Sequence, residues 1–339
     1  MSIDGSARPR ASRLGVLLLL AVSLLTAACG GGGDTATSSQ PTAGSEQKQY
    51  KIKVGTLRQP HLFAPAFYEK FLPANVKMET VLFANSTEIK TAVITGSVDF
   101  AVTGITAALE GAAQDEPFRV LASAADGASA IVAKAGKGIA KVTDLKGKKI
   151  GYVVGSAQDI LLRLTLRDAG LDADKDVELV KVGFSDMANA LDRGDIDAFS
   201  GAETGPSDAP RDGVGQLVVH PYDTKMKMIN IVFGTSQAMI DKDRDLVRTM
   251  VEVHAKATDY MKANPTEWAD GVVKAYNFPA QSLDLALKNI QLRWGVDDAY
   301  MAQTRVLGEQ LEILKQIKKQ PDYTAFFNTD FVTPLMKAR

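Results

Sequence analysis

The chain has 339 residues, 45% of them apolar, and 39 Lys and Arg residues nearly balance 40 Asp and Glu residues to give a formal net charge of −1. A chain so close to neutrality has no global field that attracts nucleic acid, so we expect no polyanion partner. One cysteine and three widely separated histidines exclude a disulfide framework, a cysteine-built metal cluster and an HExxH zinc site, so we expect neither a metal nor a cofactor.

The first 28 residues have the pattern of an export signal. Three arginines (Arg8, Arg10 and Arg13) precede a uniformly apolar run at 14–25, and the small residues Thr26-Ala27-Ala28 follow it. This run is shorter than the ~20 residues that a membrane-spanning helix needs. The pattern predicts a signal peptide at 1–28.

Cys29 lies between that segment and a string of glycines. Leucine, small residues and then cysteine resemble the lipobox of bacterial lipoproteins, in which the thiol takes a lipid and anchors the exported protein to the cell membrane. Thr26 stands where leucine is usual, and an ordinary cleavage site that leaves a free thiol is the alternative. Residues 29–49 are rich in Gly, Ser, Thr and Gln and predict a flexible tether.

Short β-branched runs alternate with helical patterns from Tyr50 onward, which is typical of parallel α/β architecture. Strands are expected at 50–57, 76–83, 97–104, 118–125, 129–136, 150–156, 177–183, 196–203, 215–221 and 228–236. Helices are expected at 64–72, 87–96, 105–114, 157–170 and 185–194, and from Asp241 almost to the end, with breaks at Asn264-Pro265, 277–279 and Gly295. Asn85, three residues before Glu88, predicts a capping box for the helix that follows it.

The α/β unit occurs twice. Residues 96–104 (GSVDFAVTG) match 194–202 (GDIDAFSGA), and Asp99 and Asp197 occupy equivalent positions, which indicates a structural role for both aspartates. The repeat predicts two lobes, at 50–133 plus 234–339 and at 134–233, with the helical tail packed on the first lobe. Two crossovers near 128–137 and 226–236 would form a hinge.

Several segments resemble the nitrate/sulfonate/taurine class of ABC-transporter substrate-binding proteins. They are VGTLRQPHLFAPAFYEKFL, ITGSVDFAVTG, VTDLKGKKIGYVVGS and ALDRGDIDAFSGAE, in order between residues 51 and 237. The resemblance implies a two-lobed type II periplasmic-binding-protein fold, with mixed sheets flanked by helices. It also implies a monomer that carries a small solute to a membrane permease and is not an enzyme.

Ligands of open α/β sheets bind outside the carboxyl ends of strands, where helix N-termini favour an anion. The side chains expected to contact the solute follow predicted strands or lie at the crossover: Arg58, Gln59, His61, Asn85, Ser86, Thr103, Gly104, Ser129, Ser156, Gln158, Phe184 and Glu203. Apolar walls are expected from Leu62, Ile105 and Phe184.

Most of these candidates have a second interpretation. Ser156 can serve only as a helix N-cap. Asn85 can be a cap too, and in that case Ser86 is free to reach the cleft. Thr103 can be an ordinary strand-end residue, His61 a packed histidine, and Arg58 the partner of an acidic side chain.

Glu203 repels a bare anion, so either it faces a hinge partner or the solute carries a cationic group, as a zwitterion does. The resemblance implies a sulfonate-like, carboxylate or zwitterionic solute, with a thiamine-type pyrimidine as the alternative, and Glu203 argues against nitrate and simple alkanesulfonates. A sensor lipoprotein that presents its closed form to a signalling partner shares all these features.

Overall fold

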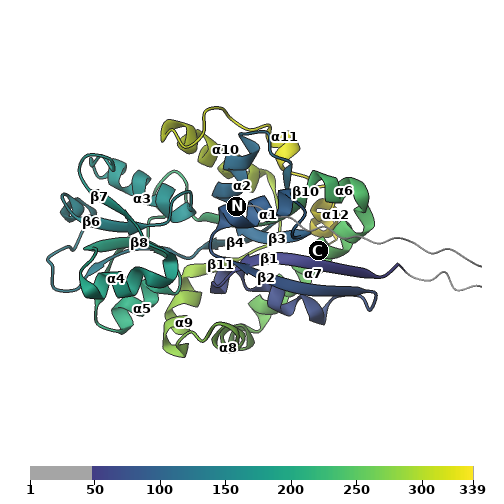
Figure 1. Ribbon diagram of the computed structural model, residues 1–339, viewed down its shortest axis with the longest axis horizontal. Helices are drawn as coiled ribbons and strands as arrows, with labels where there is room; N and C mark the ends of the chain where they lie inside the picture. Colours follow the sequence, from purple (N-terminus) through teal and green to yellow (C-terminus); the bar gives the residue numbers. More distant parts are fainter. Residues whose placement is uncertain (1–47, 339) are drawn as a thin grey trace, which may run out of the picture. The chain divides into compact units, whose positions relative to one another are not determined.

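The computed structural model describes residues 48–338, which contain two β-sheets joined by two chain crossovers. One sheet has six strands in the order β11-β4-β10-β3-β1-β2, and the other has five in the order β7-β6-β8-β5-β9. We call the six-stranded sheet with its helices lobe one, and the five-stranded sheet with its helices lobe two (Figure 1). The predicted export signal, tether and Cys29 lie outside the described residues.

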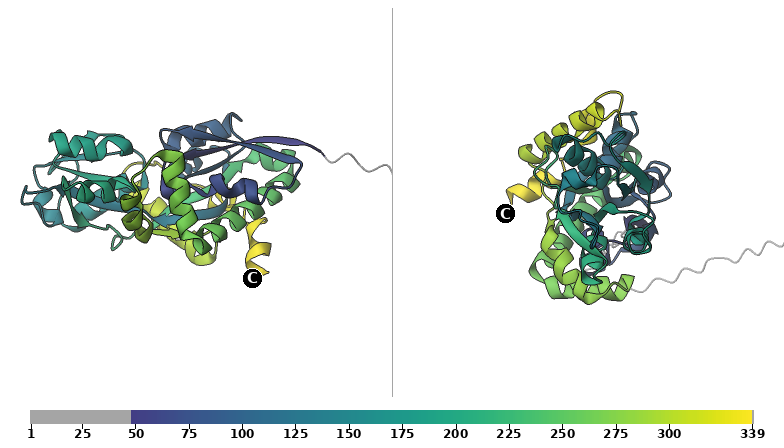
Figure 2. Two further views of the ribbon diagram at one scale, coloured as in Figure 1. Left: turned by 90° about the horizontal axis from the view of Figure 1, so that it is seen from below. Right: turned by 90° about the vertical axis from the view of Figure 1, so that its left-hand side faces the viewer.

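Lobe one contains both ends of the described chain. Its strands are β1 (Tyr50–Leu57), β2 (Val76–Phe83), β3 (Phe100–Gly104), β4 (Phe118–Gly127), β10 (Ile229–Ser236) and β11 (Ile290–Leu292). Its helices are η1 (Pro60–Leu62), η2 (Ala64–Lys70), α1 (Ser86–Ile94), α2 (Ile105–Ala112), α6 (Gln237–Lys242), α7 (Arg244–Ala263), α8 (Pro265–Tyr276), α9 (Ala280–Ala286), η5 (Leu287–Asn289), α10 (Asp298–Ile313), α11 (Tyr323–Phe326) and α12 (Val332–Lys337). The helices after β10, green to yellow in Figures 1 and 2, gather mainly around the strands of this sheet.

Lobe two is formed by the chain between the crossovers. Its strands are β5 (Ser129–Lys134), β6 (Lys149–Tyr152), β7 (Glu178–Lys181), β8 (Ala198–Ala202) and β9 (Gly215–Val219). Its helices are η3 (Val142–Leu145), α3 (Ala157–Asp168), η4 (Phe184–Asp186), α4 (Met187–Arg193) and α5 (Gly205–Arg211). In Figure 1, α3 lies on one side of the sheet, and α4 and α5 lie on the other.

The alternation of residues along β5 explains these two layers. Ile131 and Ala133 pack with Leu162 and Leu166 of α3, whereas Ala130 and Val132 pack with residues of α4 and α5 such as Leu191 and Ala209. Because successive side chains of a strand point to opposite faces, a strand that is apolar at every position is covered on both sides.

Most predicted strands and helices are observed, although α5 was not predicted and the strand predicted at 150–156 ends at Tyr152. Three further differences concern η2, β11 and the lobe boundaries. The strands predicted at 50–57 and 76–83 are observed with those bounds. The helix predicted at 64–72 is a 3₁₀-helix at Ala64–Lys70, with i to i+3 hydrogen bonds at both ends. Strand β11 was not predicted, because three residues are too few to show a period of two.

The third difference concerns the lobe boundaries. The predicted divisions at 133/134 and 233/234 fall inside β5 and β10. The chain instead passes from the six-stranded to the five-stranded sheet at Ala128 and returns between β9 and β10. Gly127, the last residue of β4, has a φ of +81°, and a Cβ there would lie 2.4 Å from the carbonyl oxygen of Asn289. Only glycine fits this close approach at the crossover.

The two aspartates of the sequence repeat make the same contact in the two lobes. Asp99 Oδ2 accepts a hydrogen bond from the backbone amide of Lys53 at 2.8 Å, and Asp197 Oδ2 accepts one from Lys149 at 3.0 Å. In each pair the aspartate amide also bonds the lysine carbonyl. Each aspartate therefore ties the start of one strand to the next parallel strand, which is the predicted structural role.

His254 belongs to the core of lobe one. Its ring stacks on Phe233 at 4.6 Å, its Nε2 bonds the carbonyl of Ser123 at 2.8 Å, and its Nδ1 bonds the hydroxyl of Tyr68 at 2.7 Å. Since a carbonyl only accepts, Nε2 carries the proton and the tyrosine donates to Nδ1. Burial lowers the pKa of His254 to about 4, so this imidazole is neutral and structural.

Candidate functional site

The predicted site residues lie at the carboxyl ends of the parallel strands in both lobes. In lobe one, β1, β2 and β3 are parallel and end at the same edge of the sheet. In lobe two, β6, β7 and β8 are parallel, and Ser129 pairs with the last residue of β8. This is the edge at which open α/β sheets bind ligands.

In lobe one, the loops after β2 and β3 are joined by Ser86. Its Oγ accepts a hydrogen bond from the amide of Gly104 at 3.0 Å, and its carbonyl accepts one from Thr103 Oγ1 at 3.4 Å. Asn85 caps α1, with its Oδ1 accepting from the amide of Glu88 at 2.9 Å. The Glu88 carboxylate accepts in return from the Asn85 side chain rather than from its backbone. The predicted cap is therefore present, and Ser86 lies beside the end of β3.

Two polar side chains at this edge are buried without a hydrogen-bond partner in the described chain. His61, on η1 after β1, is 2% exposed, and neither of its ring nitrogens has a partner. Thr106, in the first turn of α2 after β3, is fully buried, and its Oγ1 also has none. Burial lowers the pKa of His61 to about 3, so the imidazole offers one donor and one acceptor rather than a charge.

Two other candidates of this loop have their contacts within lobe one. The guanidinium of Arg58 donates to the carbonyl of Tyr276 and lies 5.9 Å from the ring centres of Tyr276 and Phe278. Among residues 48–338 it has no acidic partner, and because Arg58 is exposed, its contact with the solute remains a prediction. Gln59 is buried, and its backbone forms the turn that leads into His61.

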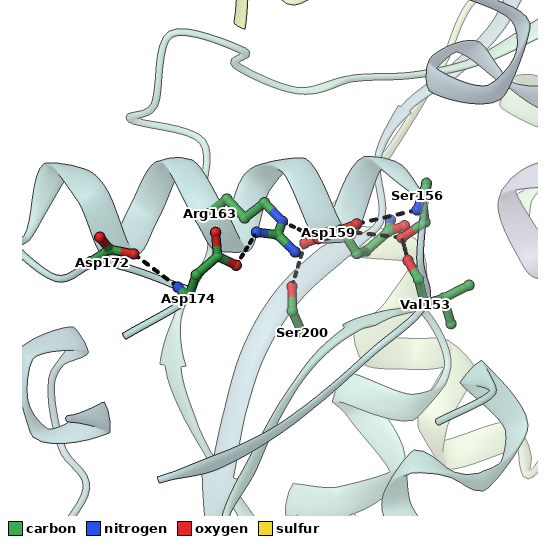
Figure 3. A network of polar contacts seen from close by, with 9 residues as sticks. Val153, Ser156, Asp159, Arg163, Asp172, Asp174 and Ser200 are labelled. Atoms are coloured by element: carbon green, nitrogen blue, oxygen red, sulfur yellow. Dashed lines mark hydrogen bonds and ion pairs between the residues drawn. The ribbon is translucent and has the colours of Figure 1, made fainter. Parts of the chain in front are cut away.

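In lobe two, Ser156 is the N-cap of α3. Its Oγ accepts from the amide of Asp159 at 3.1 Å and donates to the carbonyl of Val153 at 2.7 Å (Figure 3). Asp159 Oδ2 accepts from the amide of Gly155 at 3.2 Å, and its Oδ1 accepts from Arg163 at 2.8 Å. The loop before α3 is thus fixed by the first turn of the helix, and ligand contact by Ser156 remains a prediction.

Gln158 and Ser129 meet at the base of this loop. Gln158 Nε2 donates to Ser129 Oγ at 2.8 Å, and the Gln158 carbonyl accepts from Ser200 Oγ at 2.8 Å. All three side chains are nearly or fully buried. Phe184, which begins η4 after β7, is half-buried. Ser129, Gln158 and Ser200 therefore form a connected polar layer at the end of the sheet.

Glu203 contacts lobe one. Its Oε1 accepts from Asn289 Nδ2 at 2.9 Å, and its Oε2 accepts from Ser207 Oγ at 2.8 Å. Asn289 Oδ1 in turn accepts from the hydroxyl of Tyr222 at 2.5 Å, and that hydroxyl accepts from the amide of Ser129 at 2.9 Å. Of the two predicted interpretations of Glu203, this geometry supports the hinge partner. Burial raises the pKa of Glu203.

A further acidic side chain at the lobe contact was not predicted. Glu110 of α2 lies one helical turn after Thr106, and its Oε2 is 3.3 Å from the position of a Cβ on Gly155 of lobe two. Its carboxylate has no hydrogen bond or ion pair among the described residues, and burial raises its pKa to about 7. The only sequence signal for a role of Glu110 was its position as an acidic residue in an otherwise apolar helical pattern.

The charge at the contact between the lobes is therefore predominantly acidic. Glu110, Asp159 and Glu203 are all largely shielded from solvent, and burial is the main cause of the raised pKa of each. Arg163 pairs with Asp159 and also with Asp174 at 3.0 Å.

Metal-ligating clusters and long apolar helices are both absent from residues 48–338. No group of three or more His, Cys, Asp or Glu side chains in this range is arranged to hold a metal ion. No helix in the same range is long and apolar enough to cross a membrane.

The profile of the NMT1/THI5 like family matches residues 69–268, which is more than half of the chain. The chain belongs to this family. A Brucella abortus protein named as a binding protein is 28% identical over 145 residues, which are 42% of this chain and 44% of that protein. The match thus spans less than half the length of this relative.

Solved structures of transport proteins share the fold. The alkanesulfonate-binding protein SsuA from Xanthomonas axonopodis pv. citri, bound to MOPS, has a TM-score of 0.73 at 16% identity and covers 84% of this chain and 99% of its own. The periplasmic nitrate-binding protein NrtA from Synechocystis PCC 6803 has a TM-score of 0.70 at 14% identity, with 85% and 88% covered. The predicted two-lobed periplasmic-binding-protein fold and the suspected family are thereby confirmed.

Proposed function

We propose that this NMT1/THI5 like protein is an extracytoplasmic solute-binding protein that captures a small organic solute between lobe one and lobe two and delivers it to the permease of an ABC importer. The observation that carries the proposal is the pair of buried polar side chains, His61 and Thr106, that lack partners at the strand ends of lobe one. Buried polar groups are otherwise nearly always hydrogen-bonded, so an absent ligand is a natural partner for both.

The charge of the site limits the solute. When ionised, Glu110 disfavours nitrate and other bare anions, whereas a zwitterion of the taurine type presents an ammonium group to its carboxylate. The sulfonate- or carboxylate-bearing end of such a solute would meet backbone amides and hydroxyls rather than a free basic side chain.

A second solute class is favoured by His61. A neutral imidazole and a carboxyl group with a pKa of about 7 together offer paired donors and acceptors, which suit the edge of an uncharged heteroaromatic such as a thiamine-type pyrimidine. The two classes differ in charge, so binding measurements separate them.

The mechanism is closure of two lobes on the solute. A solute that bonds His61 and Thr106 in lobe one and the polar layer around Gln158 in lobe two binds the closed form more tightly than the open form. The ratio of these two affinities sets how far the solute shifts the equilibrium toward the closed form. The permease would bind the closed form.

Export and anchoring complete the proposal. A signal peptide at 1–28 and a lipid on Cys29 would place the monomeric protein on the outer face of the cell membrane, beside its permease. Signalling rather than transport would use the same closure, and the partner that co-purifies with the closed form separates the two roles.

A thermal-shift screen tests the proposal. The purified protein is unfolded and refolded to remove carried ligand, and then screened with taurine, alkane- and arylsulfonates, nitrate, aromatic carboxylates and pyrimidines. A solute at a hundredfold above its Kd stabilises the native state by about 2.7 kcal/mol. We expect a shift of several degrees from zwitterions or from pyrimidines. A folded protein that no member of the panel stabilises contradicts the proposal.

A further inference from the structure

Helix α3 of lobe two packs one of its faces on lobe one. Ala157, Ile160, Leu161 and Leu164 lie on this face and belong to the buried apolar cluster of lobe one rather than to the two clusters of lobe two. None of the four is more than 3% exposed. The contact between the first two turns of α3 and lobe one therefore excludes water, and an unpaired charge in such a place is costly.

Glu110 of α2 faces this contact from lobe one. Its Oε2 lies 3.3 Å from the position of a Cβ on Gly155, in the loop that leads into α3. The amide of Gly155 donates to Asp159 Oδ2 at 3.2 Å. A carboxylate of lobe one and a carboxylate of lobe two therefore both lie at this loop.

The charged groups around Glu110 leave its carboxylate without a cation of its own in the described chain. Lys90 of α1 favours the ionised form, but its ammonium group pairs with Glu116 at 2.5 Å. Asp159 of α3 opposes ionisation, and its own cation, Arg163, bonds it at 2.8 Å. Burial is the largest influence and raises the pKa of Glu110 to about 7.

The other polar contacts between the lobes are paired. Arg167 of α3 donates to Gln310 of α10 at 3.1 Å, and Glu203 accepts from Asn289 at 2.9 Å. Of the acidic side chains that the structure places at the lobe contact, Glu110 is thus the one without a protein donor. Its protonation state, unlike theirs, has no hydrogen-bond partner to stabilise the charged form.

We propose that Glu110 is a proton-dependent switch of the lobe contact, which closes when its carboxyl group is protonated and opens when it is ionised. Ionisation places an unpaired charge in a dry contact beside Asp159, and separation of the lobes returns that charge to water. If the solute binds the closed form, which rests on the function proposed above, the solute binds more tightly at acidic pH than above neutral pH.

The direction of the effect follows from proton binding. In the closed form Glu110 keeps its proton up to about pH 7, whereas a Glu110 exposed to water in an open form has the ordinary pKa of 4.5. Closure therefore takes up a proton between these two values. Raising the pH from about 5 to about 8 should lower the ratio of closed to open molecules about tenfold or more.

Double electron–electron resonance on the full chain without added solute tests the proposal. Spin labels at Glu79→Cys of β2 and Asn189→Cys of α4, both exposed positions, report the distance between the lobes in a Cys29→Ser background. The protein is refolded to remove carried solute and is measured at pH 5 and at pH 8. Glu110→Gln cannot ionise, and Glu69→Gln at an exposed position of η2 is the matched control. Glu110→Met repeats the test with a second side chain that cannot ionise.

The expected result is that the parent protein and Glu69→Gln change from a short distance at pH 5 to a longer one at pH 8, whereas both Glu110 variants keep the short distance at both values. The proposal is overturned if the parent protein has the same distribution at both pH values. It is also overturned if the Glu110 variants lengthen with pH as the parent does, or have the long distance throughout. No solute is added, so failure here is distinguishable from failure of the proposed function, which the thermal-shift screen tests separately.

Discussion

Glu203 of lobe two accepts a hydrogen bond of 2.9 Å from Asn289 of lobe one, and Asn289 also accepts one from Tyr222. This single amide therefore joins the end of β8, the segment before β10 and the start of β11. Because Glu203 is only 2% exposed, its carboxylate depends on protein donors rather than on water.

Replacing Asn289 by alanine should lower the free energy of unfolding by about 1–3 kcal/mol, because Glu203 loses a donor and Tyr222 an acceptor in a buried setting. Urea unfolding measures the change. Asn189→Ala, at an exposed position of α4, is the matched control and should be nearly neutral. Equal effects of the two substitutions would show that the Glu203–Asn289 bond contributes nothing.

Glu110 should make stability fall as pH rises. Its pKa is about 7 in the folded protein against 4.5 as a model group, so between these values the folded state holds the proton more strongly than the unfolded state. Stability from this group is then lost on going from about pH 4.5 to about pH 7, by about 3 kcal/mol at most.

Glu110→Gln removes that titration. We expect the variant to be more stable than the parent protein at pH 8 and to differ little at pH 4.5, as measured by urea unfolding at both values. Glu79→Gln, at an exposed position of β2, is the control and should not change the pH dependence. A parent protein and Glu110→Gln variant with the same pH profile would refute the assigned shift.

Thr106→Val should separate binding from stability. The hydroxyl it removes is buried and unpartnered, so the free energy of unfolding should stay the same or rise slightly. Affinity for the solute found in the thermal-shift screen should fall about tenfold or more. Thr165→Val is a matched control, because it removes another unpartnered buried hydroxyl, on α3, and it should leave the affinity unchanged. Unchanged affinity in Thr106→Val argues against solute contact at this position.

Arg163 should keep Asp159 charged, and Asp159 in turn holds the loop before α3 through the amide of Gly155. Arg163→Leu leaves a buried carboxylate unpaired, and breaking such a pair costs about 3–5 kcal/mol. Adding Asp159→Asn to Arg163→Leu should recover much of the loss, because the unpaired charge is removed with its partner. A double variant no more stable than Arg163→Leu would exclude this explanation.

The fold followed from local patterns, and the site followed only in part. Strand alternation gave the bounds of β1 and β2, and the repeated Gly-x-Val/Ile-Asp turn located Asp99 and Asp197, because both signals act over a few residues. The partner of Glu203 lies 86 residues away and that of Arg58 lies 218 residues away, and neither pairing leaves a local trace.

Thr106 and Glu110 were missed for a related reason. Both lie within a helix whose other residues are mostly apolar, and one sequence does not show which face of that helix meets lobe two. Ser156 and Asn85, by contrast, were predicted with two possible roles, and the structure uses both as helix caps.

A distance between the two lobes shows directly whether the solute closes lobe two on lobe one. Spin labels at Glu79→Cys of β2 and Asn189→Cys of α4, both exposed positions, report that distance by double electron–electron resonance in a Cys29→Ser background. If the solute drives closure, saturating solute replaces a broad distribution of distances between the labels by a narrow one centred at a shorter distance. An identical distribution with and without bound solute would contradict it.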